Sequence, residues 1–267
     1  MNKDRIAILA GDGELPVILA GRLSEQSKIK VIIVLQGLKK RFENFNCMVL
    51  GIAHGQVTEI LRLLSENRIN KVIIIGKIDK RGFIQRKGFD ENTLKIIQNM
   101  MDGKDLTIFQ SIHDVLEKIG IEILPQDLYL NDMIVDKGIL TELYPTEREN
   151  EDAIFGMEYA KQLATMDIGQ TIVVNNKTIL AVEAAEGTND AIKRGGLIGK
   201  HGSVVCKAAR NNQDRRFDIP AVGIQTVRIM SKYGCSLLAL EAGMILLVNR
   251  DEVIDYANKK KLILMGM

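Results

Sequence analysis

The sequence predicts an α/β protein in which an N-terminal Rossmann-like domain with a parallel sheet precedes a C-terminal mixed α+β domain. In the first half, short runs of β-branched residues alternate with amphipathic segments, as in parallel sheets that are buried on both faces. The periodicity fades over 135–150, where Gly138, Pro145 and many charged residues are typical of a linker. We therefore expect an N-terminal domain over 1–134, this linker, and a C-terminal domain over 151–267.

Strands and helices alternate in the expected N-terminal domain. Residues 5–10 (RIAILA) predict a strand that ends at Gly11, and residues 15–26 predict an amphipathic helix. Pro16 falls in the first turn of this helix, where the missing N–H of proline costs nothing. Further strands are expected over 31–35, 48–50, 71–76 and 121–124, and further helices over 57–68, 91–101 and 105–119.

The second half combines a hairpin signal with separate helical and strand segments. A helix is expected over 151–166, and the stretch 170–184 predicts two strands joined by a turn at Asn175 and Asn176. These signals predict a mixed α+β domain, although they do not define the order of its strands. Further strands are expected over 203–209, 236–242 and 244–249, and further helices over 226–234 and from residue 251 onward.

Composition excludes several classes of protein. The 267 residues include 36 Lys and Arg against 34 Asp and Glu, a formal charge of +2, and 4% are aromatic, which argues against a nucleic-acid binder. An apolar fraction of 46% supports packed cores, but no apolar run reaches the roughly 18 residues that span a membrane. The N-terminal apolar run is interrupted by charges, unlike a signal peptide. Cys47, Cys206 and Cys235 form no disulfide pattern, so we expect a reducing, cytoplasmic compartment.

A glycine-rich turn is the first candidate for ligand binding. Gly11, Gly13 and Pro16 lie in GDGELP, between the first expected strand and helix, where glycines let a ligand approach and a helix N-terminus binds phosphate. The motif is not GxGxxG, and the acidic Asp12 and Glu14 oppose a pyrophosphate at this turn. A turn that the fold alone requires is an equally good interpretation.

A second glycine pair follows the expected strand over 48–50. Gly51 and Gly55 flank His54, and a helix follows them. The carboxyl ends of parallel strands meet at one edge of a sheet, so this turn and GDGELP are expected at the same edge, where ligands bind. We interpret His54 as a surface histidine, because no nearby residue identifies a catalytic partner.

Acidic residues follow the second strand of the expected hairpin. Glu183, Glu186 and Asp190 carry the carboxylate oxygens that Mg²⁺ prefers, and a threonine among them adds a hydroxyl. Glu183 interrupts an apolar strand, where a carboxylate needs a partner. In a second interpretation, which is compatible with the first, Thr188 or Asn189 caps the helix that follows.

A dense basic segment is the third candidate. Between Lys207 and Gly223 several basic residues precede Asp218, a combination that suits phosphoryl transfer, in which basic groups clamp phosphate oxygens and a carboxylate holds a metal or a water. Composition alone favours a solvated surface loop. Glu241 adds another carboxylate within an apolar strand, and repeated buried carboxylates in one domain are typical of active sites.

Taken together and in order, these segments resemble one family. The segments AGDGELP, GKDLTIFQSIHDVLEKIGIEI, MDIGQTIVVNNKTILAVEAAEGT, RFDIPAVG and LEAG are similar to those of the UDP-2,3-diacylglucosamine pyrophosphatases of the LpxI type, over the whole chain. The resemblance implies a cytoplasmic, Mg²⁺-dependent enzyme of lipid A biosynthesis that hydrolyses UDP-2,3-diacylglucosamine to 2,3-diacylglucosamine 1-phosphate and UMP. It also implies a Rossmann-like first domain and a catalytic second domain, with the lipid between them.

The resemblance also assigns roles to residues. Asp218 matches the aspartate that the family requires for hydrolysis. The family has an aspartate directly after Thr188, where this chain has Asn189 followed by Asp190, so either Asp190 takes that role or the carboxylate is dispensable. The implied catalytic residues are Asp218, Glu186, Lys207 and Arg216, the implied metal ligands are Asp218, Glu183 and Asp190, and the implied substrate-binding residues are Gly11, Gly13, Pro16, Gly187, Thr188 and Gln213.

Several alternatives stay open. The basic stretch Lys77–Lys87 is either a peripheral contact with the anionic inner-membrane surface or a solvated loop. The segment GGLIGKHG, which contains His201, is assigned no role. Among rival functions, the broken GxGxxG disfavours a nicotinamide-dependent oxidoreductase, and a non-enzymatic nucleotide-binding regulatory module is the main alternative.

Overall fold

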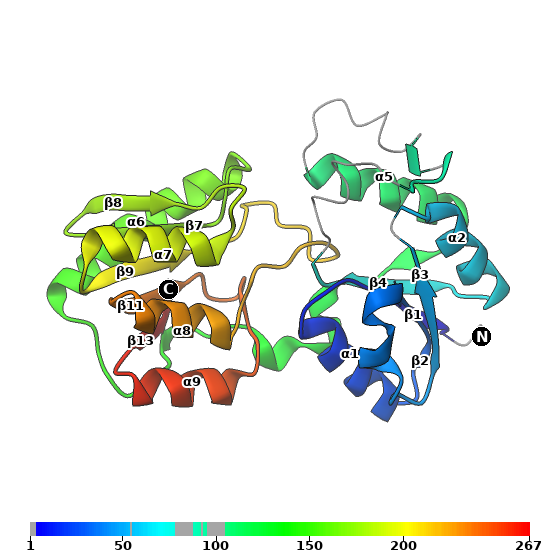
Figure 1. The fold of residues 1–267 in the computed structure, drawn as a ribbon, viewed down its shortest axis with the longest axis horizontal. Coiled ribbons are helices and arrows are strands. Elements are labelled where there is room, and N and C mark those ends of the chain that lie inside the picture. The colour runs from blue at the N-terminus through cyan, green and yellow to red at the C-terminus, as the bar shows by residue number, and fades with distance from the viewer. Residues whose placement is uncertain (1–3, 54, 78–87, 92, 95–104) are drawn as a thin grey trace. The chain divides into compact units, whose positions relative to one another are not determined.

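A computed structural model describes residues 4–53, 55–77, 88–91, 93–94 and 105–267, which form two compact units (Figure 1). The first unit consists of Met1–Leu130 together with Asp214–Asp218, and the second of Asn131–Gln213 together with Ile219–Met267. The chain therefore passes between the units three times: after Leu130, after Gln213 and after Asp218.

The segment 135–150, expected as a linker, is part of the second unit. Val135 is buried in the core of that unit, and strand β6 (Gly138–Ile139) pairs with the last strand of its sheet. The polar character that suggested a linker reflects a short edge strand and an exposed turn, where Tyr144 is 77% exposed.

The first unit is built on a five-stranded parallel sheet in the order β3-β2-β1-β4-β5. The runs of Ile, Val and Leu that predict β1 and β2 are almost entirely buried, as in parallel strands covered on both faces. The expected Rossmann-like sheet is confirmed. Its strands are β1 (Ile6–Ala10), β2 (Ile29–Leu35), β3 (Met48–Ile52), β4 (Lys71–Ile75) and β5 (Glu122–Ile123).

The helices of the first unit agree with the expected pattern where they are described. α1 carries Pro16 in its first turn, as predicted, whereas the helix expected over 91–101 falls almost wholly outside the described residues. In the core, strand residues such as Val31 and Val72 pack against residues of the helices. Phe217 from the segment Asp214–Asp218 belongs to the same core. The elements are α1 (Leu15–Glu25), α2 (Val57–Glu66) and α5 (Asp105–Lys118), with 3₁₀ segments η1 (Gln36–Phe42) and η2 (Gln126–Tyr129).

The second unit contains a six-stranded mixed sheet in the order β6-β13-β11-β9-β7-β8. The central strands β13, β11 and β9 are parallel, whereas β6, β7 and β8 pair with their neighbours in antiparallel fashion. The expected mixed α+β class is confirmed, but the strand expected over 244–249 lies outside this sheet. Its short β12 pairs with β10, and Leu246 also forms an isolated bridge with Ile134. The strands are β7 (Thr171–Asn175), β8 (Thr178–Val182), β9 (Ser203–Lys207), β10 (Ala221–Val222), β11 (Cys235–Leu240), β12 (Leu246–Leu247) and β13 (Ile263–Gly266).

Two local details of the second unit differ from expectation. The first helix begins at residue 147, earlier than expected, because Thr146 and Glu149 form a capping box. The hairpin turn lies one residue later than expected, at Asn176 and Lys177, since both have φ near +50° and Asn175 still pairs with the next strand. The helices are α6 (Glu147–Thr165), α7 (Thr188–Gly199), α8 (Ile224–Lys232) and α9 (Arg250–Lys259), with the 3₁₀ segment η3 (Asn131–Met133).

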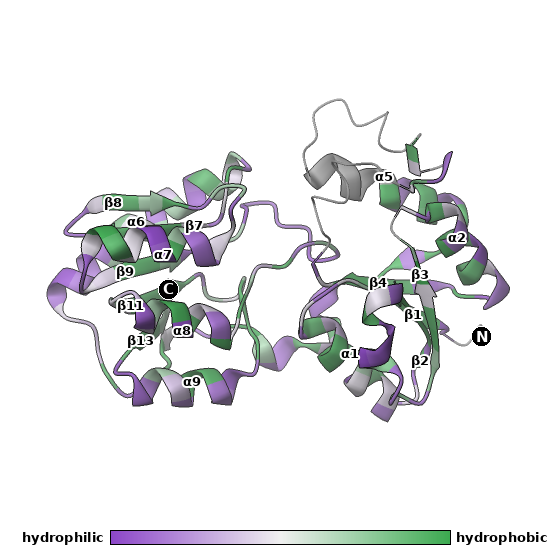
Figure 2. Cartoon of the chain, viewed as in Figure 1, coloured by the Kyte–Doolittle hydropathy of each residue, from purple (hydrophilic) through white to green (hydrophobic). Residues whose placement is uncertain are grey.

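The hydropathy of the residues differs between the strands and the helices. Figure 2 shows mainly hydrophobic strands, whereas the helices carry hydrophilic residues along part of their surface. This distribution is typical of helices that pack one apolar stripe against a sheet. In the described part of the chain, no helix has both the length and the apolar character needed to cross a bilayer.

Candidate functional site

A group of polar side chains lies at one edge of the sheet in the second unit. Lys207 is the last residue of β9, Thr171 is the first residue of the antiparallel strand β7, and Glu183 directly follows β8. Thr171 and Lys207 are register partners, and the backbone N–H of Glu183 donates to the Thr171 carbonyl at 2.8 Å. The sheet topology thus brings these residues together with Thr188, the first residue of α7; we call these four residues the Lys207 cluster.

The Lys207 ammonium is the centre of this cluster. The side chain is only 6% exposed, and Nζ donates to the hydroxyls of Thr171 at 3.2 Å and Thr188 at 3.0 Å. The Glu183 carboxylate lies 3.7 Å from Nζ and accepts the Thr188 hydroxyl at 2.8 Å. A buried charge persists where it is paired and hydrogen-bonded in this way. The partner expected for Glu183 is therefore Lys207.

Gly187 determines how the chain enters α7. Its φ is +85°, a backbone conformation that favours glycine, and it is the N-cap residue of the helix, with no side-chain cap. The expected cap by Thr188 or Asn189 is wrong, because the Thr188 hydroxyl bonds within the Lys207 cluster and the Asn189 amide oxygen accepts from Thr226 at 3.3 Å.

The other two acidic residues of this segment differ in their surroundings. The Glu186 carboxylate accepts from the Arg194 guanidinium at 2.6 Å and from the Ala184 N–H at 3.2 Å. Its own backbone N–H and Arg194 hold the pKa of Glu186 below its usual range. Asp190 is exposed in the first turn of α7 and has no ion-pair partner among the described residues.

Glu241, at the same edge of the sheet, contacts residues other than Glu183 and Thr188. It follows β11, and its N–H donates to the Lys207 carbonyl at 3.1 Å. Its carboxylate accepts the Ala209 N–H at 2.9 Å and lies 3.1 Å from the Lys161 ammonium. Glu241 therefore fixes the turn that follows β9.

Arg216 and Asp218, two of the predicted catalytic residues, lie on the segment 214–218 of the first unit. Phe217 anchors this segment in the core of that unit, where it is 4% exposed. The Arg215 guanidinium lies 3.1 Å from the Asp127 carboxylate. Asp218 therefore belongs to the Rossmann-like unit, although its position in the sequence suggests the C-terminal domain.

The two ends of the segment 214–218 differ: Asp214 pairs with a side chain, and Asp218 has an uncommon backbone conformation. The Arg216 guanidinium donates to the Asp214 carboxylate, with a shortest distance of 2.7 Å, and this hydrogen bond holds the pKa of Asp214 below its usual range. Asp218 is exposed and has a φ of +51°, an uncommon conformation for a residue other than glycine, although aspartate tolerates it. The chain leaves the first unit directly after this turn.

The GDGELP turn uses its backbone groups within the first unit. The N–H of Asp12 donates to the Lys77 carbonyl at 2.9 Å, and a Cβ on Gly11 would lie 2.5 Å from that carbonyl oxygen. The Asp12 carboxylate accepts from the Gly13 N–H and from Arg41, both at 2.7 Å. These contacts account for Gly11 and for the hydrogen bonding of the turn, which supports the structural interpretation of the motif.

The second glycine turn also has internal contacts. β1 and β3 belong to one parallel sheet, so the two turns follow strands that end at the same edge, as expected. A Cβ on Gly51 would overlap the Gln36 side chain, and Gly55 has a φ of +69°. His54 lies outside the described residues.

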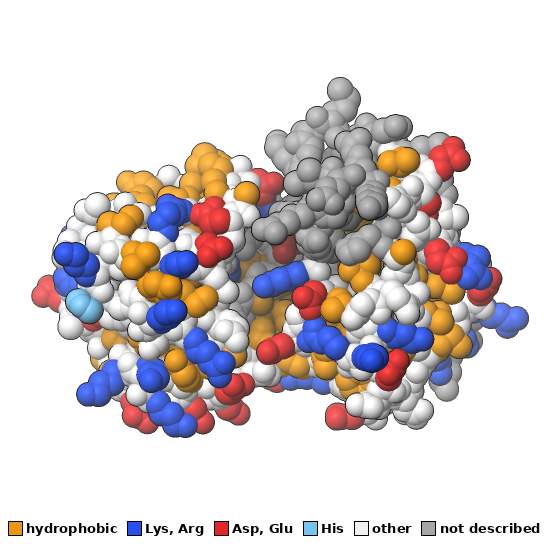
Figure 3. All heavy atoms as spheres, in the orientation of Figure 1, with side chains coloured by type: hydrophobic (Ala, Val, Ile, Leu, Met, Phe, Trp, Pro, Cys, Tyr) orange, Lys and Arg blue, Asp and Glu red, His pale blue; other side chains and the backbone are white. Residues whose placement is uncertain are grey.

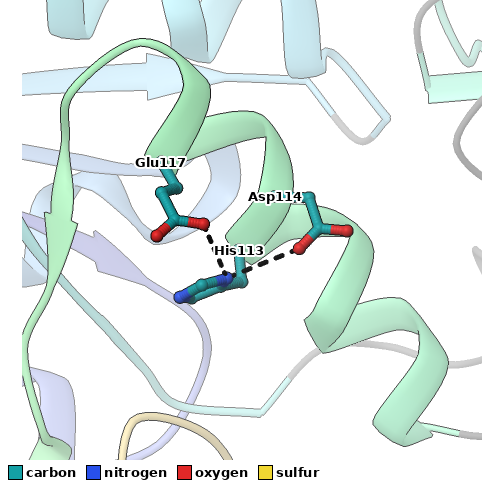
Figure 4. Close-up of side chains that lie close together, drawn as sticks. All are labelled: His113, Asp114 and Glu117. Atoms are coloured by element: carbon teal, nitrogen blue, oxygen red, sulfur yellow. Dashed lines mark ion pairs between the residues drawn. The ribbon is translucent and has the colours of Figure 1, made fainter.

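A cluster on α5 has no counterpart in the sequence-based expectations. His113 Nδ1 lies 3.5 Å from the Asp114 carboxylate and 3.8 Å from that of Glu117 (Figure 4). Both carboxylates are more than half exposed, and the charges of Asp214 and Arg216 reach this cluster. The cluster thus contributes to the electrostatics around the segment 214–218, and the i, i+4 spacing of a histidine and a glutamate is the only sequence signal for it.

A Rossmann-like parallel sheet, a mixed α+β unit and a buried lysine between two hydroxyls and a carboxylate define a class: two-unit α/β proteins with a buried charged site in the second unit. The chain matches a family model described as the LpxI N-terminal domain over residues 5–133, and one described as the LpxI C-terminal domain over residues 136–265. The chain belongs to the LpxI family.

A curated relative extends this comparison along the whole chain. The protein is 26% identical over 275 residues to the UDP-2,3-diacylglucosamine pyrophosphatase LpxI of Caulobacter vibrioides. The match covers 98% of this chain and 97% of the relative. The family resemblance of the sequence motifs is thus confirmed.

Proposed function

We propose that this protein hydrolyses the pyrophosphate bond of UDP-2,3-diacylglucosamine to release 2,3-diacylglucosamine 1-phosphate and UMP, a step of lipid A biosynthesis in the cytoplasm. Membership of the LpxI family supports the proposal. The observation that carries it is the match to the C. vibrioides enzyme along almost the full length of both chains.

Within the Lys207 cluster, the ammonium of Lys207 is the positive charge that we assign to the diphosphate. We assign Lys207 to stabilise the negative charge that develops on phosphate oxygens as the P–O bond breaks. Thr171, Thr188 and Glu183 hold its ammonium in place, so that little reorganisation accompanies the reaction. In this proposal Glu183 is the counter-ion of Lys207.

Mg²⁺ dependence is a further part of the proposal. The ion would neutralise the diphosphate and lower the pKa of a bound water. The exposed carboxylates of Asp190 and Asp218 fit the oxygen ligands that Mg²⁺ prefers. Glu183 fits less well, because the Lys207 ammonium lies 3.7 Å from its carboxylate and repels a cation. Within the second unit we therefore favour Asp190 over Glu183 as a ligand, and Asp218 stays a ligand predicted from the resemblance to the family.

Asp218 is the residue on which turnover is expected to depend most, and this role rests on the resemblance to the family. Its carboxylate would hold the metal or accept the proton of the attacking water. Arg216 is a weaker candidate, because its guanidinium is already bonded to Asp214. Gly11, Gly13 and Pro16 at the nucleotide end, and Glu186, Gly187, Thr188 and Gln213 near the phosphates, stay predictions.

Product identification tests the proposal. The purified protein is incubated with UDP-2,3-diacylglucosamine and Mg²⁺, and the products are separated and identified by mass spectrometry. We expect equimolar UMP and 2,3-diacylglucosamine 1-phosphate. A folded protein that binds the substrate or UMP but forms no product would instead favour the nucleotide-binding regulatory module.

A further inference from the structure

The outer face of α7 carries an unusual combination of side chains. Positions 189/190, 193/194 and 197/198 are exposed, whereas Gly195 and Gly196 face the unit, against Val173 and Tyr233. The exposed positions recur every four residues, so they form one stripe along the helix. We define the α7 face as Asp190, Lys193, Arg194, Leu197, Ile198, Lys200 and His201, all of which are exposed. Asp190, at the start of the helix, is the acidic member of this set.

The apolar part of the α7 face is a pair of neighbouring aliphatic side chains. Leu197 is 61% exposed and Ile198 is 58% exposed, although both lie in a helix that packs closely on the sheet. These two large apolar side chains stand next to each other on the outer turn of the helix, where they can enter an apolar surface together. They belong to GGLIGKHG, the segment for which the reaction provides no role.

Basic residues surround this apolar pair. Lys193 lies one helical turn before Leu197, and Lys200 and His201 follow the helix. Within the described part of the chain Lys193 and Lys200 have no ion-pair partner, whereas Arg194 pairs with Glu186 at 2.6 Å. Figure 3 shows hydrophobic side chains with several Lys and Arg side chains around them on the unit that carries α7. The α7 face is therefore complementary to a surface that is both apolar and anionic.

A second copy of the chain is a poorer partner for this face. A two-fold contact centred on Leu197 and Ile198 would bring Lys193 of one copy close to Lys200 of the other, and like charges across an interface are unfavourable. An anionic bilayer instead accepts Leu197 and Ile198 among its acyl chains, while its headgroups bind the lysines. This is the pattern of amphipathic helices that lie in the membrane interface.

We propose that the α7 face binds the surface of an anionic lipid bilayer. The same helix begins at Thr188 of the Lys207 cluster. At a rise of 1.5 Å per residue, Ile198 lies about 15 Å further along the helix axis. The apolar pair of the α7 face and the Lys207 cluster are therefore at opposite ends of one helix. The proposal requires no assumption about the reaction, and it concerns a different segment from Lys77–Lys87, of which only Lys77 is described.

Vesicle sedimentation tests this proposal with the full-length protein. Vesicles of phosphatidylcholine alone are compared with vesicles that contain phosphatidylglycerol, at low and at high salt. We expect binding to the anionic vesicles only, with the bound fraction falling at high salt because the lysine contribution is screened. Replacement of both lysines (K193E with K200E) is expected to weaken binding by about tenfold or more, and L197S with I198S to weaken it at either salt concentration.

Matched variants on other surfaces are the controls. K259E with K261E changes the charge equally at exposed positions near the end of α9, and I154S removes an apolar side chain that is 56% exposed on α6. Both controls are expected to bind like the wild type. The proposal is overturned if the wild type does not bind, or if the α7 variants bind as it does. It is also overturned if the L197S/I198S pair abolishes a concentration-dependent dimer, which would assign the α7 face to a second copy.

Discussion

The sheets of the two units end in different ways. In the first unit, the loops that follow β1 and β4 are joined by backbone hydrogen bonds between Asp12 and Lys77, and Arg41 pairs with the Asp12 side chain on the surface. In the second unit, the sheet edge encloses Lys207 with Glu183. A buried ion pair contributes little net stability compared with apolar residues of the same size. The proposed mechanism gives these buried charges a chemical role, which the surface pair of the first unit does not have.

The largest expected effect concerns Asp218. This residue belongs to the first unit, so it tests whether that unit takes part in the proposed reaction. Asp218→Asn is expected to lower turnover by about a thousandfold or more, with substrate binding largely kept. Asparagine tolerates the φ of +51° at this position, so the backbone is preserved. Initial rates of UMP release and equilibrium binding of the substrate measure the two quantities. Near-normal turnover would remove Asp218 from the mechanism.

Phe217 tests whether the first unit holds the segment 214–218 in place. Phe217→Ala is expected to destabilise this unit by about 3–5 kcal/mol, because it leaves a cavity in the core. Phe217→Leu is the milder control. Urea unfolding followed by hydrogen exchange of first-unit amides measures the effect. Unchanged protection in β1 and β4 would contradict this anchoring role.

Lys207 tests the charged edge of the second unit. Lys207→Met keeps the length of the side chain and is expected to reduce kcat by about a hundredfold. Because it leaves the largely buried Glu183 carboxylate without its counter-ion, it is also expected to lower the free energy of unfolding by about 3–5 kcal/mol. Glu183→Gln is expected to reduce it less, without changing the Mg²⁺ concentration required. Lys161→Met, at a partly exposed lysine that pairs with Glu241, is the control. A raised Mg²⁺ requirement in Glu183→Gln would identify Glu183 as a metal ligand instead.

The capping box gives a smaller effect in the second unit. Thr146→Ala removes the hydroxyl that accepts the Glu149 N–H at the start of α6. The free energy of unfolding is expected to fall by about 1 kcal/mol, with unchanged specific activity. Chemical denaturation measures this. No loss of stability would mean that α6 is held by its packing alone.

The smallest expected effect is a pH dependence in the first unit. Because Arg216 lowers the pKa of Asp214 in the folded protein, the ionised carboxylate stabilises the fold at neutral pH. That contribution is lost as the pH falls below about 4, the range in which aspartate takes up a proton. Asp214→Asn is therefore expected to be less stable than the wild type at pH 7, and the difference to shrink on acidification. A constant difference across this range would contradict the assigned pairing.

The sequence predicts the first unit well because its central strands, such as β1 and β2, are continuous apolar runs that are almost entirely buried. It predicts less of the second unit. The pairing of β6 with β13 and the separation of β12 from the sheet depend on contacts between distant segments. The earlier start of α6 was present in the sequence, as Thr146 followed by Glu149.

The candidate site shows the same limit. Glu183 stands out at the end of an apolar run, yet nothing local identifies Lys207 and Thr171 as its neighbours, because three strands bring them together. The return of 214–218 to the first unit has only Phe217, one apolar residue in a charged run, as its sequence signal. The resemblance to the family therefore assigns roles to residues such as Lys207 and Asp218, whereas the neighbours of these residues become known only from the structure.

UMP release from UDP-2,3-diacylglucosamine by the wild-type protein, with Mg²⁺ and then with excess EDTA, tests the central claim most directly. The account predicts release with Mg²⁺, its loss on chelation, and its recovery when Mg²⁺ is restored. Equal release in both conditions would contradict the metal-dependent mechanism, and no release from folded protein in either condition would contradict the proposed hydrolysis itself.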